Sequence, residues 1–409
     1  MATPNALTSR KRRLHLAKPF WAATKHISAP SIPTPSARSW DVIIVGAGIS
    51  GALMAEALTR KNRRVLIVDR RVPVRGSSIA STAMIQHEID VPLHHLARRM
   101  GADAARTWRR SVRAVQDLQD LVARLGIACD MQAKQALYLT GDEMGHRAMR
   151  SEFEARQNAD IACDYLDQAE LMQRFGIDRS AAILSGTSAS ANPGQLTAGL
   201  LSVAQARGAE IASPVEITDL AETGDSAALA TREGGVLTAE QVVFCTGYEF
   251  LPVMESRAHR ITSTWALASR PRIARPDWLD RSLVWEASEP YLYFRSARDG
   301  RIIAGGEDMD DPEAYRDPAR LHAKARRIAL KLRNLCGIEI GSPAYVWAAP
   351  FGNTSDGLPI IDRVPGFSCA HAVMGFGGNG ITFSMIAAQI IAARLSDKRD
   401  PDEELFAFR

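Results

Sequence analysis

The feature that most constrains this chain is a glycine-rich turn, Gly46-Ala47-Gly48-Ile49-Ser50-Gly51, between an apolar run and a helical stretch. Residues 41–45 predict a strand buried on both faces, and residues 52–60 predict a helix. In a G-x-G-x-x-G turn the first glycine allows the tight bend, the second allows a pyrophosphate to approach, and the third allows close helix–strand packing. The turn therefore predicts a dinucleotide-binding βαβ unit. Its expected cofactor contacts are Gly46, Gly48, Ile49, Ser50 and Gly51.

A carboxylate follows at the spacing that this unit requires. A second apolar run, residues 64–68, ends at Asp69, 18 residues after Gly51. A carboxylate at this point accepts hydrogen bonds from the ribose hydroxyls, and it would repel a 2′-phosphate. The spacing favours FAD or NAD over NADP, and we also expect the adjacent Arg70 at the cofactor site.

Three further loops favour FAD over NAD. Residues 76–82 (GSSIAST) form a small, hydroxyl-rich loop soon after Asp69, and residues 354–359 (TSDGLP) form a second loop. Residues 375–382 (GFGGNGIT) form a third loop that precedes a helix. The backbone N–H groups of this third loop and the start of its helix predict a nest that stabilises an anion.

With these loops in place, the sequence resembles the D-amino-acid oxidase/glycine oxidase/sarcosine oxidase superfamily of flavoproteins, over residues 41–391. The resemblance implies that the last glycine-rich loop faces the N1–C2=O edge of the flavin, where a partial positive field stabilises the reduced form. It also places the 76–82 loop beside the phosphates and the ribityl chain. Carried over by position, the implied FAD contacts are Gly46, Gly48, Gly51, Asp69, Ser77, Ser78, Ser81, Thr82, Val215, Thr246, Gly247, Gly357, Gly377, Gly378, Asn379, Gly380, Ile381 and Thr382.

The sequence also departs from that superfamily. Gln86 stands where sarcosine oxidases carry a substrate-binding arginine, and Phe351 stands where glycine oxidases carry theirs. No cysteine near Thr354 matches the cysteine that links the flavin covalently in some relatives, so we expect non-covalent FAD. Residues 285–310 contain no lysine, although the oxygen-activating lysine of sarcosine oxidases belongs there. The resemblance therefore does not carry over a substrate.

A replacement carboxylate clamp is predicted on one strand. Tyr291, Tyr293 and Arg295 alternate, so their side chains project from one face. The resemblance implies that a strand at this place lines the substrate cavity, where an arginine could bind a carboxylate bidentately, with the tyrosine hydroxyls assisting. Alternatively, Arg295 is a surface residue and the tyrosines are core residues. Gln86 and His87 complete the expected substrate-binding set, although a lone histidine is more often structural.

The order of elements predicts an α/β fold. Buried strands near both ends of the chain flank a central region of aromatic-rich strands. We therefore expect a Rossmann-like FAD-binding domain interleaved with an antiparallel-sheet substrate domain. The expected ranges are 1–39 for a basic leader and linker, 40–130, 185–250 and 340–409 for the FAD-binding domain, and 131–184 and 251–339 for the substrate domain.

Charge and cysteine usage narrow the partners. Residues 1–39 carry seven basic and no acidic residues, so the +4 net charge of the chain leaves −3 for residues 40–409. We interpret the arm as a solvated, partly disordered leader, and the body excludes a nucleic-acid binder. Five scattered cysteines indicate a reducing compartment, and we expect a cytoplasmic protein without a transmembrane segment. Adjacent His94 and His95 lack further ligands at suitable spacing, so no metal is expected.

The expected reaction is oxidation of a C–N bond by hydride transfer to flavin N5, followed by imine hydrolysis, with no catalytic residue required beyond the flavin. The favoured substrates are glycine-type, N-substituted (sarcosine- or iminodiacetate-like) or D-amino acids. Molecular oxygen or an electron-acceptor protein takes the electrons. Two alternatives stay open: a flavin dehydrogenase of a 2-hydroxy acid or polyamine derivative, and an electron-relaying subunit of a multi-component dehydrogenase.

Overall fold

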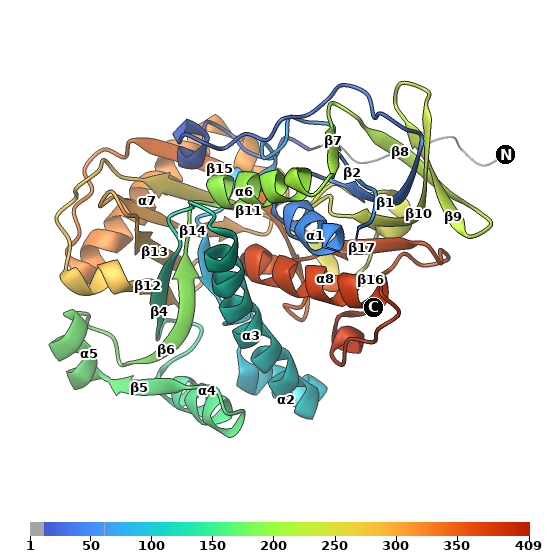
Figure 1. Ribbon diagram of the computed structural model, residues 1–409. Coiled ribbons are helices and arrows are strands. Elements are labelled where there is room, and N and C mark those ends of the chain that lie inside the picture. The colour runs from blue at the N-terminus through green and yellow to red at the C-terminus, as the bar shows by residue number, and fades with distance from the viewer. Residues whose placement is uncertain (1–11, 61) are drawn as a thin grey trace.

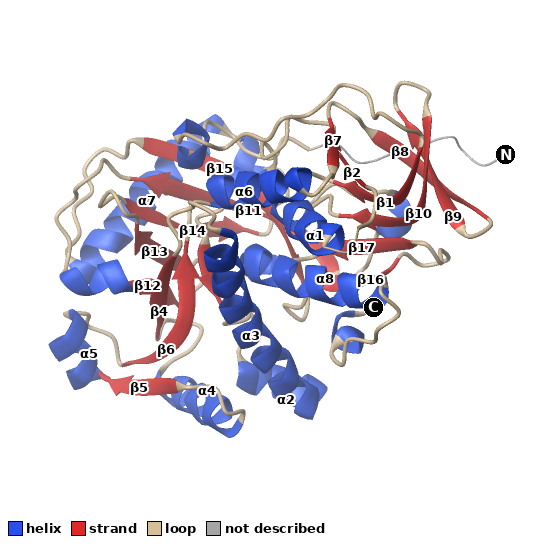
Figure 2. Ribbon diagram, viewed as in Figure 1, coloured by secondary structure: helices blue, strands red, loops and turns tan. Residues whose placement is uncertain are grey.

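Two β-sheets dominate the computed structural model, which describes residues 12–60 and 62–409. Figure 1 shows the two sheets in separate lobes, with α1, α3, α6 and α8 in the region between them. Figure 2 shows that the strands of each lobe come from distant parts of the chain, as the interleaved α/β prediction requires. Among the described residues, none of the helices combines the length and the apolar character needed to cross a membrane.

The first sheet contains the predicted dinucleotide-binding unit. Its central strands β10, β1 and β2 are parallel, with Ile43 paired to Val242 and to Leu66. Strand order is β16-β17-β10-β1-β2-β7, with a β8–β9 hairpin added through β9 to β10. The strands are β1 (Ser39–Val45), β2 (Val65–Val68), β7 (Glu210–Ala212), β8 (Ile217–Thr223), β9 (Ser226–Thr231), β10 (Val236–Phe244), β16 (Ile360–Arg363) and β17 (Ala370–Met374).

Helices that are apolar on all sides fill the space beside this sheet. Almost every residue of α1 (Ile49–Thr59) is buried, as are ten of the fifteen residues of α8 (Gly380–Arg394), as expected for helices packed on most faces. Both helices begin at glycine-rich loops, so their N-termini point toward the same region. The other helices are α2 (Leu93–Met100), α3 (Ala102–Leu125), α4 (His146–Asn158), α5 (Gln168–Phe175), α6 (Pro193–Ala206) and α7 (Pro318–Cys336).

The second sheet is antiparallel except for the β12–β4 pair. Its order is β15-β11-β14-β13-β12-β4-β6-β3, with β5 on β6, and α7 packs against β11, β14 and β15. The strands are β3 (Met84–Gln86), β4 (Gln132–Leu139), β5 (Cys163–Asp167), β6 (Ala181–Ser190), β11 (His259–Ala268), β12 (Ser282–Glu286), β13 (Leu292–Ser296), β14 (Ile302–Met309) and β15 (Tyr345–Thr354).

The sheets differ from the expected domain ranges in three places. β3, β15 and residues 185–190 of β6 belong to the second sheet, although they were expected in the FAD-binding domain. β15 is the edge strand next to β11, and all ten of its residues have partners on that strand. The division into the remaining ranges stays a prediction.

The N-terminal arm is not a free leader from residue 12 onward. Leu14, Leu16, Phe20 and Trp21 are buried, and Leu16 forms a β-bridge with Ala348 of β15. Apolar side chains spaced along residues 14–29 explain this docking, because their burial outweighs the solvation of the nearby basic residues. The expectation of a solvated, partly disordered leader is therefore wrong for residues 14–29. Residues 30–39 are mostly exposed, and Arg10 and Lys11 lie outside the described residues.

Candidate functional site

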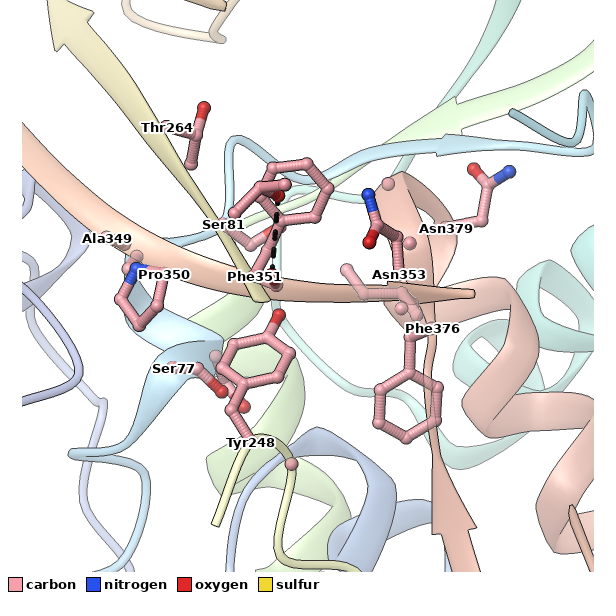
Figure 3. A pocket seen from close by; sticks show the side chains of 18 of the residues that line it. Ser77, Ser81, Tyr248, Thr264, Ala349, Pro350, Phe351, Asn353, Phe376 and Asn379 are labelled. Carbon is pink, nitrogen blue, oxygen red and sulfur yellow. Dashed lines mark hydrogen bonds between the residues drawn. The ribbon is translucent and has the colours of Figure 1, made fainter. Parts of the chain in front are cut away.

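A cavity of about 940 Å³ runs between the two sheets. One side of the cavity consists of loops that follow β1, β2, β10 and β17 at the carboxyl edge of the parallel sheet. The other side consists of residues on β11, β13, β14 and β15. Ligands of open α/β sheets bind at this edge. Figure 3 shows Tyr248 and Phe376 from the first side and Thr264, Phe351 and Asn353 from the second around one part of the cavity.

The glycine turn leaves no room for side chains where a pyrophosphate would approach. A Cβ atom on Gly51 would collide with the Gly46 carbonyl oxygen, and Gly46 has φ of +115°, a region that disfavours other residues. A Cβ atom on Gly48 would lie 3.0 Å from Ser78 Oγ, at the start of α1. The first N–H group of α1, that of Ile49, donates to Ser78 Oγ at 2.9 Å. Gly48 provides no side-chain cap for the N–H groups that follow, so these are available to an anion.

Asp69 ends β2 at the predicted position. Its Oδ2 accepts a hydrogen bond from Ala47 N at 2.8 Å, and its Oδ1 accepts one from Arg71 N at 2.8 Å. Burial raises the pKa of Asp69, while these two N–H donors lower it. The carboxylate is therefore fixed beside the glycine turn, and its remaining lone pairs are available for the ribose hydroxyls.

The serine-rich loop is held at its back by three donor side chains. Trp347 Nε1 donates to Ala80 O at 2.8 Å, and Trp21 Nε1 donates to Ser81 O at 2.7 Å. Arg295 Nε donates to Thr82 O at 2.8 Å. These three consecutive carbonyl groups point away from the cavity, and the serine hydroxyls of the loop line it. Trp21 belongs to the N-terminal arm, so the arm contributes directly to the position of this loop.

In the loop before α8, where the sequence predicts an anion-binding nest, one backbone N–H group already has a carboxylate of the protein as its partner. Gly378 N donates to Asp90 Oδ2 at 2.8 Å, so a carboxylate lies at the backbone N–H group expected to bind an anion. Burial raises the pKa of Asp90, and the Gly378 N–H lowers it. Asn379 Nδ2 donates to Glu88 O, and Thr382 Oγ1 donates to Gln86 O at 2.9 Å. The nest is thus tied to the segment around β3.

The cavity brings most of the predicted cofactor residues together. Its lining contains Gly46, Gly48, Ile49, Ser50, Asp69, Arg70, Ser77, Ser78, Ser81, Thr82, Val215, Thr246, Gly247, Gly377, Gly378, Asn379, Gly380 and Ile381. Gly51, Gly357 and Thr382 lie outside the lining. Gly51 and Gly357 serve close packing instead, because Cβ atoms there would press on Gly46 and Val91 respectively.

Two predicted substrate contacts lie outside the cavity. Arg295 is 2% exposed, and it also donates from Nη1 to Ser296 O at 3.2 Å and from Nη2 to Ala191 O at 2.9 Å. With both planar edges of the guanidinium engaged, it does not offer a two-donor fork to a substrate, and the predicted clamp is wrong. His87 is buried with Nδ1 at 2.7 Å from Thr187 O, so its predicted place in the substrate site is also wrong.

Tyr291, Tyr293 and Gln86 do line the cavity. The tyrosine ring centroids are 5.5 Å apart, and burial raises the pKa of each hydroxyl. Among the described residues, buried Gln86 Oε1 has no hydrogen-bond partner. These three side chains are therefore placed to contact a bound molecule.

Several cavity residues were missed by sequence reasoning. The second sheet adds Thr262 and Thr264 from β11, and Asp308 from the end of β14. Arg260, which the sequence offers as the next candidate for the clamp after Arg295, lines the cavity on the same strand. Alternation on one face is a signal that the sequence carries, but it does not reveal which face meets a cavity. Tyr248, Trp285 and Tyr138 line the cavity as well, and the last two rings stack with centroids 3.7 Å apart.

Within the described parts of the chain, no group of three or more histidine, cysteine, aspartate or glutamate side chains is arranged to hold a metal ion. Of the predicted pair, His94 contacts the buried Glu152 through Nδ1 at 2.8 Å, and His95 lines the cavity. The contact with Glu152 thus explains the position of the His94 side chain without a metal ion.

The parallel sheet, the glycine turn with Asp69, and the nest before α8 define a dinucleotide-binding oxidoreductase whose second domain covers the cofactor cavity. The chain belongs to the family of FAD dependent oxidoreductases called DAO, whose family model matches residues 41–394. This membership confirms FAD dependence as a property of the family.

Individual relatives are distant. A Bacillus subtilis protein called putative Rieske 2Fe-2S iron-sulfur protein YhfW is 22% identical over 392 residues, covering 95% of this chain and 74% of that protein. Glycine oxidase from Geobacillus kaustophilus has a similar fold with a TM-score of 0.75 and 20% identity, over 91% of this chain and 99% of that one. Iminodiacetate oxidase from Chelativorans sp. BNC1 also has a similar fold, with a TM-score of 0.71 and 19% identity, over 90% of this chain and 98% of that one. At these identities the solved structures show the fold.

Proposed function

We propose that this protein uses non-covalent FAD to oxidise the C–N bond of a glycine-type, N-substituted or D-amino acid. The observation that carries the proposal is the single cavity that joins the cofactor loops to the tyrosine-bearing face of the second sheet. The similar folds of glycine oxidase and iminodiacetate oxidase support an amino-acid substrate class. Sarcosine-like compounds belong to the same class.

The residues present fit FAD. The N–H groups at the start of α1 and the serine loop would hold the pyrophosphate, Asp69 the adenosine ribose, and Gly377–Gly380 the pyrimidine edge of the flavin. Bound FAD supplies a hydride acceptor at N5. Cys245 lines the cavity but is 5% exposed, and burial raises the pKa of its thiol. Because the thiol form is a poor nucleophile, we infer that the FAD is not covalently attached.

The protein's own residues orient the substrate. Arg260 lines the cavity on β11, two residues before Thr262, which pairs with Phe351 of β15. Arg260 binds the substrate carboxylate, the role that the sequence first assigned to Arg295. Tyr291, Tyr293 and Thr264 surround the substrate chain from the sheet side. The cavity holds the amine with its α-C–H directed toward the cofactor side, and loss of the hydride leaves an imine that water hydrolyses.

The electron acceptor is molecular oxygen or a protein. The YhfW relative is called an iron–sulfur protein, which supports the alternative of a unit that passes electrons onward. Mixing the reduced protein with air distinguishes the two, because rapid peroxide formation indicates an oxidase. A cytoplasmic location stays a prediction from the scattered cysteines.

Anaerobic bleaching of the flavin absorbance tests the proposal. The purified protein should be yellow, acid should release FAD from it, and one class of amine or amino acid should bleach it. A flavin that stays with the acid-precipitated protein contradicts non-covalent attachment. Bleaching by 2-hydroxy acids alone contradicts oxidation of a C–N bond and supports the alternative dehydrogenase.

A further inference from the structure

The substrate half of the cavity contains a buried carboxylate without a cationic partner. Asp308 lines the cavity at the end of β14, and both of its carboxylate oxygens are inaccessible to solvent. Among residues 12–60 and 62–409, neither oxygen has a hydrogen-bond partner of good geometry. Buried charges are nearly always paired in folded proteins. A buried carboxylate in a cavity that has only the Thr264 and Tyr291 hydroxyls beside it therefore indicates that its cationic partner is a ligand.

Further acidic side chains surround this carboxylate. Lys331 lowers the pKa of one of them, Glu289, but forms its ion pair with Glu307. Asp90 and Glu289 raise the pKa of Asp308 by their charge, and Glu143 and Asp310 raise the pKa of Glu289 in the same way. All five line the cavity. Within the described chain, neither Asp90 nor Asp308 forms an ion pair. An anionic group placed among these side chains would be repelled, whereas a cationic group would be attracted.

The side chains around Asp308 suit an alkylammonium group. The hydroxyls of Thr264 and Tyr291 lie beside the carboxylate and lower its pKa, while burial has the larger effect and raises it to about 7. The rings of Tyr291 and Tyr293 provide apolar walls for methylene groups and π faces for a cation. The chain thus provides one negative charge at the base of an aromatic-walled recess.

We propose that Asp308 binds an ammonium group of the substrate other than the one being oxidised, so that the preferred substrate carries a second positive charge. Basic amino acids carry such a group and lie within the proposed function. The inference rests on that function and narrows it, because iminodiacetate-like substrates with a second carboxylate are excluded. Diamines carry the same group but no carboxylate for Arg260, so a preference for them is a separate outcome of the test.

Matched pairs of amines test the charge requirement in the holoenzyme. Lysine and norleucine, each as both enantiomers, differ by one terminal ammonium group, as do 1,4-diaminobutane and butylamine. We expect the charged member of at least one pair to reduce the flavin at least about tenfold more efficiently, equivalent to about 1.4 kcal/mol. If lysine is preferred over norleucine and 1,4-diaminobutane does not reduce the flavin, the substrate is an amino acid. If 1,4-diaminobutane is preferred over butylamine and lysine does not reduce the flavin, the substrate is a diamine.

Asp308→Asn tests the residue, since it keeps the shape and removes the charge. The variant should lose most of the preference for the charged member of each pair, whereas Asp225→Asn, an exposed change in the β8–β9 turn, should keep it. FAD content and the quenching of tryptophan fluorescence by 1,4-diaminobutane or lysine give readouts that do not depend on turnover.

The outcomes separate this inference from the proposed function. If the wild-type protein oxidises an amine but shows no preference for the charged member of either pair, the Asp308 subsite is overturned while C–N oxidation stands. An unchanged preference in Asp308→Asn also overturns it. If no amine of any charge bleaches the flavin, the proposed function itself fails. The wild-type comparison remains decisive even if the variant does not fold.

Discussion

Replacing Arg295 by alanine separates a positioning role from a substrate-binding role. In the structure this buried guanidinium donates to the carbonyls of Thr82, Ala191 and Ser296. Thr82 ends the serine-rich loop that faces the cofactor, and Ala191 follows β6. Arg295→Ala would therefore remove a bond between the cofactor loop and the second sheet and leave three carbonyls without this donor.

The magnitude follows from these contacts. A buried acceptor left unsatisfied costs about 1–3 kcal/mol, and removal of the buried cation recovers part of its desolvation cost. We expect the free energy of unfolding to fall by about 3 kcal/mol. Release of Thr82 should also weaken FAD binding by about tenfold. Arg295→Lys should recover only part of either loss, because one ammonium does not reproduce the planar set of donors.

Chemical unfolding and FAD titration of the apoprotein measure the two effects. Arg298→Ala is the matched control: its side chain is 73% exposed and pairs with Asp130 at 3.0 Å, so it should cost less than about 1 kcal/mol. The positioning role would be refuted by an Arg295→Ala protein with wild-type stability and FAD affinity that has lost activity on carboxylate substrates alone. That result would restore the clamp on Arg295.

Three further predictions test other parts of the site. Gly48→Val should fold but bind no FAD, because its side chain would occupy the pyrophosphate path; native FAD affinity in a folded variant would show that the site is misplaced. Trp21→Phe removes the donor to Ser81 O and should weaken FAD binding about fivefold to tenfold, measured by titration, whereas unchanged affinity would make the arm irrelevant to the loop. Asp308, with a pKa near 7, is ionised above that pH, so the preference for lysine over norleucine should rise between about pH 6 and about pH 8; a flat profile would contradict an Asp308 subsite. The titratable groups around Asp308 are Tyr291, Tyr293, Glu289 and Asp90.

The dinucleotide-binding unit could be predicted because its signals are local. The strand, the glycine turn, the helix and Asp69 lie within residues 39–69, and each has its own sequence signature. β6 and β15 carried no such signal. β6 consists mainly of small residues, and β15 contains Pro350 and Gly352, which disfavour strands. Their pairing depends on β4 and β11, which are distant in sequence.

The cofactor half of the site was predictable for the same reason, and the substrate half was not. Alternation placed Arg295 on the face of Tyr293 but gave no sign that the carbonyls of Thr82 and Ala191 would cover it. Asp308 follows Gly306 and Glu307, which both have positive φ at a bulge in the β11–β14 pairing. A bulge re-aims the side chains beyond it, so the strand pattern of the sequence does not show where Asp308 lies.

The most direct test of the account is a single anaerobic turnover with its products counted. Holoprotein mixed with excess amine should release one carbonyl compound and one amine or ammonia for each FAD reduced, because the imine that leaves the cavity is hydrolysed. Deuterium on the carbon that bears the nitrogen should slow the bleaching, since the C–H bond breaks in that step. Reduction of FAD with a carbonyl product and no released nitrogen would contradict C–N oxidation and identify the substrate as an alcohol.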